Sequence, residues 1–295
     1  RRAVWASLRL LAETVVILPV HLYKRTPKGR ERQYDHACHH VMQTPKSFST
    51  RFDLMHHLMI SCALWGNGYV RIFRDKAFRP VRLKFLHPAT VEPVLTDNDN
   101  LFYRLNSGEM VPSDDMIHLR GLSTNGYKGK SPIAVHRANL CLTQAAQESG
   151  DRFFNQGGNM SGVFKYPSTL KPESYQRLKK DLMAQSVGLH NAHIPLLLEG
   201  GMTYERISIP PEDAQFIATR KFQKTEIATI YGVPPHMIAD LERATNNNIE
   251  HQGMEFVTYC LMPYLVRIEE ELNRKMLRSD EFGNYYFLFG VNGLL

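Results

Sequence analysis

Residues 208–238 read SIPPEDAQFIATRKFQKTEIATIYGVPPHMI and predict a helix with clear ends. Pro211, Glu212 and Asp213 form its first turn, where proline is tolerated and acidic side chains interact favourably with the helix dipole. Gly232 can end the helix, and the proline pair that follows at 234–235 cannot continue it. The stretch therefore predicts one helix over residues 211–232.

A second helix with comparable signals lies upstream, over residues 131–158. Ser131 and Pro132 suit its N-cap and first helical position, and two glycines at 157–158 stop it. Residues 159–210 lie between the two helices. They predict a compact insert with an extended piece at 163–166, a helix at 172–187, and strands at 194–198 and 202–209 joined at two glycines.

The chain downstream of residue 232 predicts a polar loop and then a long helix. Residues 242–248 are polar, and the helix is predicted over 249–277, with a kink at Pro263. An apolar residue recurs every three or four positions along this helix, which indicates one buried face. The stripe consists of Val257, Leu261, Leu265, Ile268, Leu272 and Met276.

Residues 1–130 mix both kinds of element. Apolar spacing predicts a helix near the N-terminus and another at 52–64, with a charged turn at 24–33 between them. Short β-like runs follow, at 69–73, 81–86, 91–95, 102–105 and 117–120. The predicted fold class is α+β: an elongated subunit with a mixed α/β domain, long helices, a small α/β insert and a long kinked C-terminal helix.

Composition excludes several classes of protein. The 295 residues are 43% hydrophobic, which is typical of a folded chain, and no stretch has the roughly 18 uninterrupted apolar residues of a membrane span. Four scattered cysteines do not form a disulfide framework or a CxxC pair. The net charge is +11 over residues 1–84 and −4 over the rest, so a generally basic nucleic-acid-binding surface is not indicated. The first residue is Arg1, and we expect the chain to be the internal portion of a longer protein.

Residues 35–40, DHACHH, are the most suggestive cluster for metal chemistry. Ligands so close in sequence cannot all converge on one ion, so a solvated helix is favoured over a metal site. The triple glutamate at 269–271, with Arg274 and Lys275, likewise predicts a solvated or subunit-facing surface. No nucleophile elbow, phosphate-binding loop or paired-carboxylate motif is present, so we predict no enzyme, no catalytic residue, no metal and no cofactor.

The whole chain resembles the portal proteins of tailed double-stranded DNA bacteriophages. The stretch 208–216, the segments 220–222 and 226–228, and YGVPPHMI at 231–238 carry most of the resemblance, supported by MPY at 262–264 and ELN at 271–273. Upstream motifs agree in order: GNGY at 66–69, LHP at 86–88, IHL at 117–119, GKSPI at 129–133 and FFN at 153–155. Each motif is weak alone, and their common order is specific.

The resemblance implies a closed ring of roughly twelve subunits around a DNA channel. Residues 1–130 would form a wing, 131–158 and 211–232 two stem helices, 159–210 a clip, and 233–295 a tunnel loop, the long kinked helix and a return to the wing. The tunnel loop would bring five residues to passing double-stranded DNA: Arg243, Thr245, Asn246, Asn247 and Asn248.

The resemblance also implies partners and a location. The clip, with exposed lysines expected at Lys179 and Lys180, would dock the terminase large subunit and later the head-completion or tail connector proteins. The ring would sit in the virion at one capsid vertex, beside major capsid or scaffolding protein, after assembly in the host cytoplasm. No contact with a membrane is expected.

Two alternatives remain open at this point. A metal-dependent hydrolase would use His36, His39 and His40, and metal analysis of a triple alanine variant would reveal it. A nucleic-acid-binding module would use the basic N-terminal third and would bind DNA tightly, with a strong dependence on salt. A channel for sliding DNA needs the opposite property, because holding every phosphate would prevent movement, and polar amides in the loop fit that need.

Overall fold

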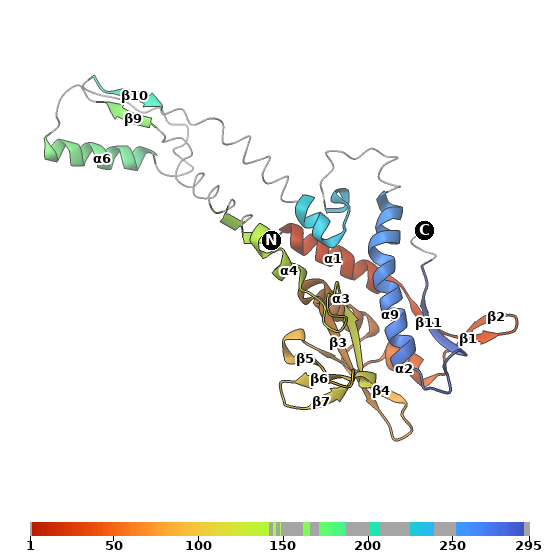
Figure 1. Cartoon of the computed structure of the whole chain (residues 1–295). Helices are drawn as coiled ribbons and strands as arrows, with labels where there is room; N and C mark the ends of the chain where they lie inside the picture. The colour runs from red at the N-terminus through yellow and green to blue at the C-terminus, as the bar shows by residue number, and fades with distance from the viewer. Residues whose placement is uncertain are drawn as a thin grey trace. The chain divides into compact units, whose positions relative to one another are not determined.

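The computed structural model of the chain describes residues 2–141, 144–145, 148, 162–165, 171–186, 201–206, 225–238 and 252–291 (Figure 1). The chain divides into two compact units. One unit contains Arg1–Arg137 with Lys224–Leu295, and the other contains Ala138–Gln223. These boundaries fall inside the two predicted stem helices. No helix among the described residues is long and apolar enough to cross a membrane.

Three helices begin the larger unit: α1 (Arg2–Ile17), α2 (Ala37–Gln43) and α3 (Arg51–Trp65). Helix α3 starts at a capping box, in which the Thr50 hydroxyl accepts from the Asp53 backbone and the Asp53 carboxylate accepts from the Thr50 backbone. It ends at Gly66, whose φ of 74° favours glycine. Helix α3 packs against α1 and against strand β3, so its buried residues form the centre of this unit.

Two three-stranded antiparallel sheets follow α3. Strand β3 (Asn67–Arg74) lies between β4 (Pro80–Leu86) and β8 (Met116–Arg120), and β6 (Leu101–Leu105) lies between β5 (Val91–Leu95) and β7 (Met110–Pro112). Short 3-10 turns precede β5 and β8, at Pro88–Thr90 (η1) and Ser113–Asp115 (η2). A core of Tyr69, Val91, Tyr103, Val111 and Met116 joins the sheets. All five predicted β runs are confirmed, and β7 is an addition.

The charged turn predicted at 24–33 was wrong. Strand β1 (Val20–Thr26) continues into it and pairs with β2 (Gly29–Arg32), so the segment is a β-hairpin. Polar strands lack the apolar alternation that identifies strands, and here the backbone pairing decides the structure. The other neighbour of β1 is β11 (Tyr285–Phe289), which brings the end of the chain back to its beginning.

The C-terminal helix is interrupted just before Pro263, where the sequence predicted a kink. Helical residues 252–255 continue into a π-helix, η5 (Phe256–Leu261), and then into α9 (Met262–Lys275). Proline has no N–H to donate to the preceding turn, and a π-helical turn accommodates that loss. The six residues of the predicted apolar stripe are all buried, and α9 packs against β8 and β11 (Figure 1).

The first predicted stem helix begins as expected at α4 (Pro132–Val135), where the Ser131 hydroxyl accepts from the Ala134 N–H. His136 then adopts a non-helical conformation, and residues 137–141 are helical again. The predicted unbroken helix is therefore wrong at this position. The second predicted stem helix is described only from residue 225, and it ends at Gly232 with φ of 65°, as predicted.

The smaller unit contains β9 (Gly162–Lys165), α6 (Pro172–Ser186) and β10 (Thr203–Arg206). Strands β9 and β10 pair antiparallel, from Thr203 opposite Lys165 to Arg206 opposite Gly162. The partner expected for the second strand, at 194–198, lies outside the described residues. The predicted helix is confirmed, and Tyr175 on it is exposed.

Candidate functional site

The five predicted DNA-contacting residues, Arg243, Thr245, Asn246, Asn247 and Asn248, lie outside the described residues. Residues on both sides of that part of the chain are described, and a hydrogen bond joins two of them. His236, on η4 (Pro235–Ile238), lies with Nδ1 2.7 Å from Oε1 of Gln252, where the chain becomes helical again. Sequence reasoning missed this pair, because nothing in the spacing of the two residues indicates that they meet.

A groove of about 710 Å³ lies beside this junction. The turn at Tyr231–Gly232 forms one wall, and η5 forms another. Cys260 on η5 donates through Sγ to the Tyr231 carbonyl at 3.3 Å, and burial raises the pKa of the Tyr231 hydroxyl to about 12. The groove is lined by Leu122, Ala228, Thr229, Ile230, Tyr231, Gly232, Val233, Pro234, Pro235, Gln252, Glu255, Phe256, Tyr259, Cys260, Pro263, Tyr264 and Arg267.

His118 on β8 lies in a buried polar network with residues of β3, β6 and the segment before α4. Asn67 Oδ1 lies 3.0 Å from His118 Nε2 and accepts from the Gly129 N–H at 2.7 Å, while Asn67 Nδ2 donates to the Gly129 carbonyl at 2.8 Å. The Tyr103 hydroxyl lies 3.0 Å from His118 Nδ1. Gly66 and Gly129 are packed so closely that a Cβ on either would meet backbone atoms.

Helix α9 is fastened to this network through charged side chains. Lys275 is buried, and its Nζ donates to the Met116 carbonyl at 2.7 Å and to Glu271 at 2.6 Å. Glu271 also accepts from the His118 backbone N–H at 2.9 Å. Burial lowers the pKa of Lys275, and Glu271 opposes that shift. The prediction that 269–275 forms a solvated or subunit-facing surface was therefore wrong for Glu271 and Lys275, because both complete the interior.

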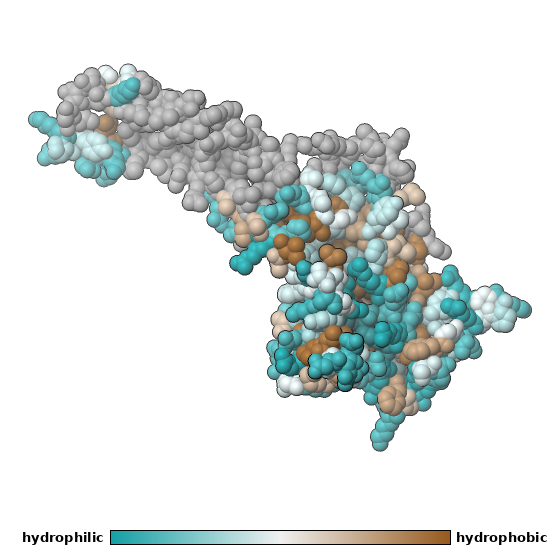
Figure 2. Space-filling view, in the orientation of Figure 1, coloured by the Kyte–Doolittle hydropathy of each residue, from teal (hydrophilic) through white to brown (hydrophobic). Residues whose placement is uncertain are grey.

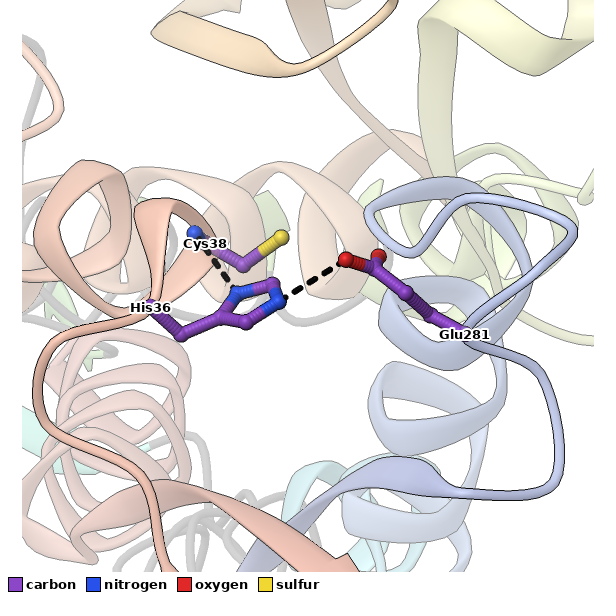
Figure 3. A group of neighbouring side chains, drawn as sticks. All are labelled: His36, Cys38 and Glu281. Atoms are coloured by element: carbon purple, nitrogen blue, oxygen red, sulfur yellow. Dashed lines mark hydrogen bonds and ion pairs between the residues drawn. The ribbon is translucent and has the colours of Figure 1, made fainter.

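The histidine-rich segment contributes two residues to a three-residue group (Figure 3). Ligand atoms of His36, Cys38 and Glu281 all lie within 4.8 Å of one another. His36 Nδ1 accepts from the Cys38 N–H at 3.2 Å and Nε2 lies 3.0 Å from Glu281 Oε1. The Cys38 thiol donates to the Met276 carbonyl at 3.1 Å, and burial raises its pKa to about 12.

Each of the three side chains thus already takes part in a hydrogen bond, and the neutral thiol is a poor metal ligand. The group ties α2 to the turn before β11. The predicted helix is present, but it is not solvated on all sides, because Cys38, Val41 and Met42 of α2 are buried. The sequence could not indicate Glu281 as a partner, since it lies 245 residues from His36.

Comparison with known proteins identifies the family. The chain matches the family model described as "Phage portal protein" over residues 2–295. It belongs to the phage portal protein family.

A probable portal protein of Streptomyces phage phiC31 is 30% identical over 95% of this chain, and the chain spans 65% of that relative's length. The portal fold also matches two solved structures. The neck of a native gene transfer agent particle, computed with C12 symmetry, matches with a TM-score of 0.70 and 21% identity over 99% of this chain and 81% of the other. An HK97-family phage portal protein from Corynebacterium diphtheriae matches with a TM-score of 0.66 and 16% identity over 99% and 94%. The α+β fold class is therefore confirmed.

Several motifs that carried the resemblance to portal proteins meet in the described structure. Asn67, His118 and Gly129 come from three separate motifs and form the buried network described above. A fourth motif, YGVPPHMI at 231–238, forms one wall of the groove and contains His236. Neither the metal-dependent hydrolase nor the general nucleic-acid-binding module gains support from the family match.

The two predicted docking lysines, Lys179 and Lys180, lie on α6, and both are exposed. Whether they contact a partner stays a prediction.

Proposed function

We propose that this chain is the subunit of a ring-shaped portal at one capsid vertex, the channel through which phage DNA is packaged and ejected. The observation that carries the proposal is the portal family match, which extends over residues 2–295. The ring would be a structural component of the virion, assembled in the host cytoplasm, and not an enzyme.

The shared fold supports a ring of about twelve copies, because the gene transfer agent neck that it matches was computed with C12 symmetry. A closed ring of identical subunits requires that each subunit meet its neighbour through two different surfaces. The hydrogen bonds of Lys275 to Met116 and Glu271 hold α9 against β8, which would fix the position of this helix within each subunit of the ring.

The junction between His236 and Gln252 supports a DNA-facing role for the segment between them. His236 Nδ1 and Gln252 Oε1 are 2.7 Å apart, so the chain is held together on both sides of this segment. The segment could therefore extend toward DNA without disturbing the structure at its base. Its amides and hydroxyl at Thr245, Asn246, Asn247 and Asn248 can exchange hydrogen bonds with phosphates without fixing a register. Double-stranded DNA could then slide past.

The smaller unit would serve as the docking platform for the terminase large subunit and later for head-completion or tail connector proteins. The larger unit would face the major capsid or scaffolding protein. Exposed cations on α6 support the first assignment, since they can select acidic surfaces on a docking protein.

The loop assignment is tested by exchanging Asn246 and Asn247 for lysine. The new cations should increase the salt dependence of DNA binding by roughly 0.9 in log–log slope for each additional phosphate that they neutralise. Rings should still form, but DNA should be packaged more slowly, most clearly at low ionic strength. The measurement is packaging rate against salt concentration.

The matched control exchanges Asn98 and Asn100, which are exposed in the turn before β6, for lysine. It adds the same charge elsewhere and should package at the parental rate. A loop variant that behaves like this control at low salt would show that the loop residues do not touch DNA.

A further inference from the structure

The outer face of the sheet β11-β1-β2 gathers arginines and tyrosines. Tyr23 pairs with Arg32 on one side and with Tyr286 on the other, and Arg25 pairs with Arg30. Paired residues share a face and successive residues alternate. Arg25, Arg30, Arg32, Tyr23 and Tyr286 therefore lie together, and we call them the arginine face. The opposite face carries Leu22 and Phe287, which are buried.

The tyrosine rings hold the guanidinium groups in place. Arg30 and Arg32 lie 4.9 Å and 6.0 Å from the centre of the Tyr23 ring, and Arg25 lies 5.3 Å from the centre of the Tyr286 ring. The Arg32 Nε also donates to the Tyr23 hydroxyl at 3.3 Å. Stacked guanidiniums keep donors at their edges free to bind a phosphate or a carboxylate. All three arginines are exposed, and in Figure 2 the tip of the hairpin is teal and white, with no brown.

No acidic side chain neutralises this charge within the described residues. Arg25, Arg30 and Arg32 form no ion pair there, and the pleat places Glu31 on the opposite face. Arg25 and Arg30 face each other directly, and like charges in that position destabilise a sheet. Burial, and then the charge of Arg32, lower the pKa of His21 on the same face. The face thus carries a positive charge that no acidic side chain among the described residues offsets by an ion pair.

Double-stranded DNA fits this face better than other polyanions. Single-stranded DNA is bound by stacking its bases on open aromatic rings, but Tyr23 is 7% exposed and arginines cover the rings. A duplex carries about one negative charge per 1.7 Å of its axis. The arginines on strands β1 and β2 can therefore contact phosphates wherever the duplex lies along the face. An acidic peptide would have to match their positions.

We propose that the arginine face binds the phosphate backbone of double-stranded DNA without sequence preference. This goes beyond the proposed function, which assigns DNA contact to the 242–248 loop alone. It also differs from a general DNA-binding module, because only three cations on one sheet are involved. Binding should therefore be weak per subunit and strengthened when many copies act together.

The test exchanges Arg25, Arg30 and Arg32 for glutamine in the full-length protein and measures binding of a mixed-sequence DNA duplex by fluorescence anisotropy. Binding at low salt should weaken at least tenfold, and the log–log salt slope should fall by roughly 0.9 for each phosphate that the variant no longer neutralises. The matched control exchanges the exposed Lys76, Arg79 and Lys84 for glutamine, which removes the same charge from β4 and the turn before it.

Three outcomes would overturn the proposal: unchanged binding in the arginine variant, an equal loss in the control, or displacement of DNA by poly-glutamate at equal charge concentration. The last would point to an acidic protein as the partner. Thermal unfolding checks that the variant folds. Glutamine removes both the repulsion between Arg25 and Arg30 and the cation–π contacts with Tyr23 and Tyr286, so we expect little change in melting temperature. Ring formation is scored separately, so failure of this proposal is distinguishable from failure of the portal assignment.

Discussion

His118 shows how one buried side chain connects distant parts of this subunit. Its two ring nitrogens are satisfied by Asn67 and Tyr103, and its own backbone N–H donates to Glu271 of α9. Burial, followed by the charges of Arg120 and Lys275, lowers the pKa of this histidine well below its usual range. The imidazole is therefore neutral in the folded protein, and it cannot take up a proton without disturbing the network.

We expect the free energy of unfolding to fall as pH drops below about 6.5, the ordinary pKa of histidine. In that range the unfolded chain binds a proton at this position and the folded chain does not, so acid favours unfolding by up to about 1.4 kcal/mol per pH unit. Urea denaturation between neutral pH and pH 5 measures this loss. Replacing His118 with glutamine should make the loss smaller. The same pH dependence in the variant and the parent would show that another group is responsible.

At the residue scale, the sequence identified several residues of the buried network, but it did not predict which of them contact one another. The motifs GNGY, IHL and GKSPI were identified by resemblance, but only the folded structure places Asn67, His118 and Gly129 in one network. The spacing does place Glu271 beside Lys275, but the Met116 partner of Lys275 and the Glu281 partner of His36 could not be predicted. A charged residue in a helix usually faces solvent, and Met116 and Glu281 are far from these residues in sequence.

At the scale of elements, apolar periodicity was a reliable guide and charge was not. The stripe on the C-terminal helix is buried at all six positions, because a repeat of three to four residues leaves a helix only one apolar face. Strand β2 was missed because its sequence, GRER, has no apolar residue and is fully exposed. Only its pairing with β1 reveals it as a strand.

Helix α6 carries the prediction that belongs to this scale. Exchanging Lys179 and Lys180 for glutamate should impair docking of the terminase and of the connector proteins, because an exposed charge that meets an acidic surface would then repel it. Rings should be unaffected. Pull-down of terminase and counting of tailed particles measure the effect. The matched control, Lys171 to glutamate just before the helix, should dock normally. Normal docking by the double variant would exclude these lysines as contacts.

At the scale of the whole molecule, the charge distribution fits a protein that guides DNA. Residues 1–84 carry a net charge of +11 and the remainder −4, so the excess of positive charge is concentrated in part of the larger unit. The arginine face lies within that basic part. The predicted loop residues are mostly amides, which do not hold phosphates tightly. A chain with this distribution of charge could bind DNA at the arginine face and let it slide past the 242–248 loop.

The ring is the central claim, and native mass measurement with negative-stain imaging of the full-length protein tests it most directly. We predict closed rings of about twelve subunits with a central hole, as cyclic symmetry requires. Leu140→Pro should abolish them, because proline in the helical residues 137–141 removes a hydrogen bond and clashes with the preceding turn, at about 3 kcal/mol or more. A parental protein that stays monomeric, or that forms open filaments without a central hole, at every concentration tested would contradict the portal assignment.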